Sequence, residues 1–172
     1  GTLEENDVGG YLVSITAIDG DDDSITVTEE FNLTVEAVED ALKIETLSSW
    51  NMSEDGILEI TEITISDIDV DTNGTGSMTV LLEVDSGFLS LGDTSSIITY
   101  HENGNELEEV RSSSLYLSGS FIDVNSSLQT LSFEPEENLN GDVGLSIKAF
   151  SSLFENINQI SDFQESIITV SA

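Results

Sequence analysis

The stretch Val143-Gly-Leu-Ser-Ile-Lys-Ala149 has an apolar residue at every second position. Because side chains of a β-strand point alternately to opposite faces, this spacing predicts a strand with one face on a core and the other in water. The same alternation recurs in residues 11–18, 25–36 and 78–84. Pairs such as Asn140-Gly141, which favour turns, separate these runs. The sequence therefore predicts an all-β fold, either a sandwich or a barrel.

One short helix is expected between strands. In residues 123–131, Asp-Val-Asn-Ser-Ser-Leu-Gln-Thr-Leu, Asn125 is a suitable N-cap. Leu128 and Leu131 would then face the core at a spacing of three residues.

A domain boundary is expected near residue 40, where the second long alternating run ends. Residues 41–172 are long enough for a sandwich, whereas residues 1–40 contain only two convincing strands. Because two strands alone are marginally stable in water, residues 1–40 are interpreted as the last two strands of an incomplete, preceding sandwich.

The charge is strongly unbalanced, with 35 Asp and Glu against 3 Lys and Arg, which gives a formal net charge of −32. Nucleic acid is excluded as a natural partner because phosphate binding needs clustered basic residues, and an anionic membrane surface is disfavoured for the same reason. No apolar run approaches the ~20 residues of a membrane span, so direct membrane insertion is not expected. The chain has no Cys, which excludes disulfides and thiolate chemistry.

Clustered acidic residues indicate Ca²⁺ binding, because calcium prefers six to eight oxygen ligands. One cluster contains Asp67, Asp69 and Asp71, a second contains Asp19, Asp21 and Asp23, and Glu54-Asp55 forms a third. Neither of the first two fits the EF-hand spacing. The alternative is an acidic hairpin turn without an ion.

Catalysis is not expected. His101, the only His, lies in a turn sequence, and no G-x-S-x-G motif is present. Carboxylate pairs are uninformative in so acidic a chain. Trp50, the only Trp, has two interpretations: an exposed platform for sugar, or a residue packed between domains.

Four Asn-x-Ser/Thr sequons allow N-glycosylation if the protein is secreted through a glycosylating pathway. They begin at Asn32, Asn51, Asn73 and Asn125.

Several blocks together resemble the cadherin-like repeats of large extracellular calcium-dependent adhesins. Residues 53–60, Ser-Glu-Asp-Gly-Ile-Leu-Glu-Ile, followed by Ile65-Ser-Asp-Ile-Asp69, resemble the start of such a repeat. Residues 115–128 and 130–141 resemble its later segments, the second reading Thr-Leu-Ser-Phe-Glu-Pro-Glu-Glu-Asn-Leu-Asn-Gly. Residues 8–41 separately resemble the tail of a dystroglycan-type cadherin repeat.

The resemblance implies an Ig-like β-sandwich in a string of extracellular repeats, with calcium stiffening the junctions. Matched by position, it implies Glu54, Asp67 and Asp69 as ligands and Glu36 and Asp40 as linker ligands.

The leading hypothesis is a non-enzymatic, extracellular structural or adhesive module, rigidified by Ca²⁺, that acts as a spacer between adjacent repeats of the same or a neighbouring chain. One alternative is a carbohydrate-binding module that grips a surface glycan on a sandwich face or through loops near Trp50 and Tyr100. Another is a subunit of an extracellular filament in which neighbouring chains complete each other's sheets.

Overall fold

The computed structural model describes residues 9–18, 20, 26–36, 41–67, 76–100, 111–150 and 162–172. The contacts within the chain divide it into two units, Gly1–Glu39 and Asp40–Ala172. We call them unit 1 and unit 2 and describe each by itself.

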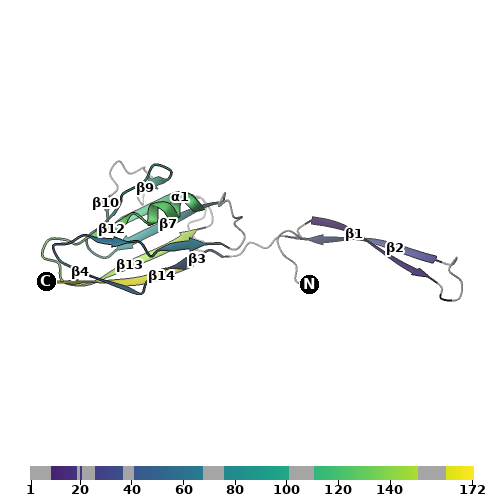
Figure 1. Ribbon diagram of the computed structural model, residues 1–172, viewed down its shortest axis with the longest axis horizontal. Coiled ribbons are helices and arrows are strands. Elements are labelled where there is room, and N and C mark those ends of the chain that lie inside the picture. The colour runs from purple at the N-terminus through teal and green to yellow at the C-terminus, as the bar shows by residue number, and fades with distance from the viewer. Residues whose placement is uncertain are drawn as a thin grey trace. The chain divides into compact units, whose positions relative to one another are not determined.

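The described part of unit 1 contains an antiparallel hairpin of β1 (Gly9–Ile18) and β2 (Thr26–Val35) (Figure 1). In its register Tyr11 lies opposite Leu33, and Val13 lies opposite Phe31. Because side chains alternate between the two faces, the apolar residues of both strands share one face. We call this surface the hairpin face; it consists of Tyr11, Val13, Ile15, Ala17, Val27, Phe31, Leu33 and Val35.

Unit 2 is built from short strands and one helix (Figure 1). The elements are β3 (Lys43–Glu45), β4 (Ser49–Ser53), β5 (Leu58–Ile60), β6 (Thr64–Ser66), β7 (Ser77–Val84), β8 (Phe88–Leu91), β9 (Ile98–Tyr100), β10 (Arg111–Ser112), β11 (Ser114–Ser120), α1 (Phe121–Leu128), β12 (Leu131–Glu134), β13 (Gly141–Phe150) and β14 (Asp162–Ser171).

The strands of unit 2 form two larger sheets and one small one. The larger sheets have the strand orders β4-β14-β13-β7-β11-β9 and β10-β8-β12-β5, and β3 pairs with β6. All these pairs are antiparallel except β4 and β14, which run parallel.

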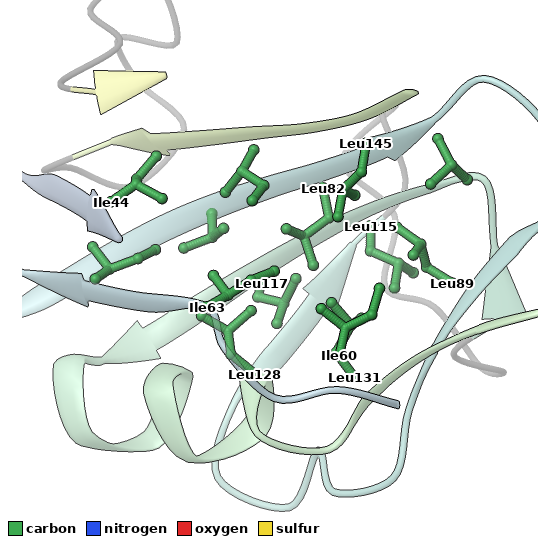
Figure 2. Packing of buried hydrophobic residues seen from close by; sticks show 14 of the residues in the cluster. Ile44, Ile60, Ile63, Leu82, Leu89, Leu115, Leu117, Leu128, Leu131 and Leu145 are labelled. Atoms are coloured by element: carbon green, nitrogen blue, oxygen red, sulfur yellow. The ribbon is translucent and has the colours of Figure 1, made fainter. Parts of the chain in front are cut away.

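The core of unit 2 is a single buried apolar cluster to which both larger sheets contribute (Figure 2). Leu82, Leu117 and Leu145 come from the six-stranded sheet and are almost completely buried. Ile60 and Leu131 come from the four-stranded sheet and are also fully buried. The fold is therefore an all-β sandwich, and this prediction is confirmed.

The helix α1 begins earlier than the sequence predicts. Its N-cap is Ser120, whose Oγ accepts a hydrogen bond from the Asp123 backbone N–H at 3.2 Å and donates one to the Asp123 carboxylate at 2.6 Å. Asn125 lies inside the helix, so its prediction as N-cap is wrong. Leu128 and Leu131 are fully buried, as their spacing predicts.

Candidate functional site

Three of the predicted calcium ligands, Glu36, Glu54 and Asp67, belong to the described part of the chain. Glu36 directly follows β2 and is exposed. Within the described ranges, no three His, Asp or Glu side chains are grouped so that they could hold a metal ion. The other predicted ligands lie outside the described residues; they are Asp19, Asp21, Asp23, Asp40, Asp69 and Asp71. Calcium binding stays a prediction.

Glu54 and Asp67 lie at opposite ends of unit 2. The Glu54 backbone N–H donates to the carbonyl of Ser171, the last residue of β14, at 2.9 Å. Asp67 follows β6, which pairs with β3, and Ile44 of β3 donates its N–H to the carboxylate of Asp162, the first residue of β14, at 2.7 Å.

The ten residues of β14 extend over ~30 Å. A calcium ion lies only ~2.4 Å from each ligand oxygen. The prediction that Glu54 and Asp67 hold the same ion is therefore wrong, because β5 and β6 carry the chain from one end of the unit to the other between them. Any ion at Asp67 must take its remaining ligands from that residue's own end of the unit.

All three basic side chains of the protein form ion pairs with glutamates. The pairs are Lys43–Glu45, Arg111–Glu134 and Lys148–Glu83, the last at 2.7 Å. The formal charge of −32 therefore stays on the molecule, and solvent cations or bound metal ions must neutralise it.

The Lys43–Glu45 pair shows how local this compensation is. The hydrogen bond to Lys43 lowers the pKa of Glu45, and the same bond raises the pKa of Lys43. Both side chains are largely exposed, so solvent screens the pair and its contribution to stability is small.

Trp50 is not a sugar-binding platform. Its side chain is buried in the core cluster of unit 2, and its indole Nε1 donates a hydrogen bond to the Glu62 carboxylate at 3.2 Å. This bond lowers the pKa of Glu62. The indole ring is inaccessible to a ligand, so the interpretation of Trp50 as an exposed aromatic is wrong. The side chain of Tyr100 and the whole of His101 lie outside the described residues.

The predicted glycosylation sites differ in accessibility. Asn32 on β2 and Asn51 on β4 are exposed, and Asn73 lies outside the described residues. Asn125 is half-buried, and its side-chain amide bridges α1 and β6.

The amide nitrogen of Asn125 donates to the carbonyls of Ile65 and Phe121, both at 2.9 Å, and its oxygen accepts from the Ile65 N–H at 2.9 Å. A glycan on this nitrogen would replace one of its two hydrogens and break a bridge. The prediction that Asn125 carries a glycan is incompatible with this structure. Its role as a tie between helix and strand is one that sequence reasoning missed.

The hairpin face is the most prominent candidate binding surface among the described residues. The exposed fraction is 42% for Tyr11, 59% for Ile15 and 50% for Phe31. Large apolar side chains gathered on one exposed face mark interaction sites in soluble proteins. The strand alternation in the sequence already predicts this face.

Comparison with known proteins gives no assignment: no protein-family model matches the chain, and no curated protein is significantly similar to it. Among the described residues, no helix is both long enough and apolar enough to cross a membrane.

Proposed function

We propose that the chain is a non-enzymatic structural or adhesive module of an extracellular protein, working as a spacer made of β-sandwich repeats. The observation that carries this proposal is the combination of a complete sandwich in unit 2 with a hairpin in unit 1 whose apolar face is exposed. Such a hairpin needs a partner sheet, so the chain is suited to a string of units.

Calcium is the second part of the proposal. The charge of −32, with every basic side chain already paired, requires external cations. The acidic clusters at residues 19–23 and 67–71 are the candidate sites. An ion bound at the junction between two units would restrict their relative motion, which is what a spacer needs.

A filament subunit is the second candidate function, because an exposed apolar hairpin can also be completed by a neighbouring chain. Glycan binding is less favoured, since the buried Trp50 offers no stacking surface.

The test of calcium stabilisation is thermal unfolding of the full chain in EDTA and in millimolar CaCl₂, at matched ionic strength. Ligand at about 100 times its Kd stabilises the folded state by about 2.7 kcal/mol. For a domain of this size that corresponds to a rise in Tm of about 10 °C.

Asp69→Ala should remove most of this rise. Glu137→Ala, which deletes one exposed carboxylate from the turn before β13, is the matched control and should keep it. Equal melting curves with and without calcium would contradict the proposal, and an equal effect of MgCl₂ would reduce it to charge screening.

A further inference from the structure

The hairpin of unit 1 repeats the last hairpin of unit 2. Strands β1 and β13 both have ten residues, Gly-Gly-Tyr-Leu-Val-Ser-Ile-Thr-Ala-Ile and Gly-Asp-Val-Gly-Leu-Ser-Ile-Lys-Ala-Phe. Aligned from their first residues, they share Gly, Ser, Ile and Ala at the same positions. Both first glycines have positive φ, 147° for Gly9 and 116° for Gly141.

The pairing of the two hairpins has the same register. Gly9 lies opposite Val35, and Gly141 lies opposite Val170. One residue further on, the partners are Thr34 in unit 1 and Thr169 in unit 2. Ser14 pairs with Glu30 in the same way that Ser146 pairs with Glu165. The sequence and the pairing thus agree that β1–β2 and β13–β14 are equivalent elements.

In unit 2 the equivalent hairpin is enclosed. Val143 and Leu145 of β13 are each 1% exposed, whereas their counterparts on the hairpin face include Tyr11 at 42%. Strand β7 pairs antiparallel with the free edge of β13, and β4 pairs parallel with the free edge of β14. In the described residues of unit 1, the corresponding edges of β1 and β2 have no such strands.

A second copy of the hairpin stacked on the hairpin face is too small a partner. Two strands of ten residues, with ~3.3 Å per residue and ~4.8 Å between strands, present a face of only a few hundred Å². A stable interface buries ~800 Å² on each partner. Completion of a sandwich uses the face and both edges and adds backbone hydrogen bonds along each edge.

We propose that the β1–β2 hairpin completes a second β-sandwich that lacks its own last two strands. The partner supplies an apolar inner sheet against the hairpin face, an antiparallel strand along β1 and a parallel strand along β2. This inference names the partner for the proposed spacer function and rests on that function only in taking the partner to be a neighbouring repeat.

The partner resembles unit 2 but has a roomier interior. Phe31 of the hairpin face occupies the position of Ser166, whose hydroxyl donates to the Leu47 carbonyl at 2.6 Å. Tyr11 occupies the position of Val143. Both side chains in the hairpin are larger than their counterparts, so the partner must leave more space at these points.

The test extends the chain with a surrogate partner. A second copy of residues 40–140 is fused directly to residue 9 of a chain that continues to residue 172. Gly9 then follows Asn140 as Gly141 does in unit 2. A second chimera also carries Tyr11→Val and Phe31→Ser, which remove the two size differences. Hydrogen exchange of the β1 and β2 amides is measured by mass spectrometry in both chimeras and in the unextended chain.

The expected result is slowing of amide exchange by at least ~100-fold in the second chimera relative to the unextended chain, with or without protection in the first. Val13→Glu, on the hairpin face, should abolish the protection. Thr16→Glu, on the opposite face, is the matched control and should preserve it.

Unprotected amides in both chimeras would overturn the inference. So would a dimer of the unextended chain that Val13→Glu dissociates in sedimentation, because the occupant would then be a second copy. A protected hairpin together with calcium-independent melting would leave the inference standing and contradict only the calcium part of the proposed function.

Discussion

Replacing Asn125 by Ala removes the tie between α1 and β6. The side chain makes three hydrogen bonds of 2.9 Å, two to the backbone of Ile65 and one to the carbonyl of Phe121. Ile65 is 60 residues away in the chain and its side chain is buried in the core cluster. Alanine would leave these backbone groups without their partners in a region that water reaches only in part.

Each such hydrogen bond contributes about 1 kcal/mol net to stability. Loss of three should lower the free energy of unfolding by about 2–3 kcal/mol, since the half-buried position lets water replace part of the interaction. Asn125→Asp should be at least as damaging, because a carboxylate keeps the acceptor for the Ile65 N–H but turns two donors into a charge facing two carbonyl oxygens.

Urea unfolding followed by Trp50 fluorescence measures this effect on unit 2 alone, because Trp50 is the only Trp and lies in that unit. With an m value of about 2 kcal/mol/M, the midpoint should fall by about 1 M. Ser126→Ala, at the exposed neighbouring position, is the control and should change the midpoint little. A loss below about 0.5 kcal/mol for Asn125→Ala would refute the tie.

Two further predictions concern unit 2. Gly87→Ala should destabilise it by about 2–4 kcal/mol in the same urea assay, because φ is +83° and a Cβ would lie 2.7 Å from the Glu134 carbonyl oxygen; Gly141→Ala, with positive φ but open space, should lose less, and equal losses would contradict the clash. The hydrogen bond from Trp50 lowers the pKa of Glu62 below its ordinary 4.5, so the stabilisation is complete above pH 4.5 and is lost as pH falls through the lower folded-state pKa. Glu62→Gln should therefore lose less stability than the native chain between pH 6 and pH 3, and an unchanged pH dependence would show that this bond does not stabilise the fold.

The strands of the sandwich were predictable because their signal is local. In residues 78–84 and 143–149 the alternating apolar side chains are the ones buried in the core. A strand with one wet face must show this period whatever its neighbours are. The hairpin face follows from the same rule.

The start of the helix was a local signal that was misread. Ser120 and Asp123 have the spacing of a capping box, and this pair, rather than Asn125, begins α1. The internal repeat was also readable: residues 9–17 and 141–149 share Gly, Ser, Ile and Ala at equal spacing.

The rest depended on contacts between distant parts of the chain. The amide of Asn125 is a tie only because β6 lies beside α1, and Trp50 is buried only because β4 joins β14. Glu54 and Asp67 are close in sequence, yet two strands carry the chain across the unit between them. Spacing along a sequence predicts a shared metal site only when the intervening chain turns back.

The most direct test of a calcium-stiffened spacer is small-angle X-ray scattering of the full chain in EDTA and in CaCl₂, at matched ionic strength and with MgCl₂ as a further control. The proposal predicts a narrow range of conformations with a defined maximum dimension in calcium, and a broader ensemble in EDTA. Asp69→Ala should give the EDTA result even in calcium. Scattering curves that coincide under all conditions would contradict the claim that calcium fixes the arrangement of the two units.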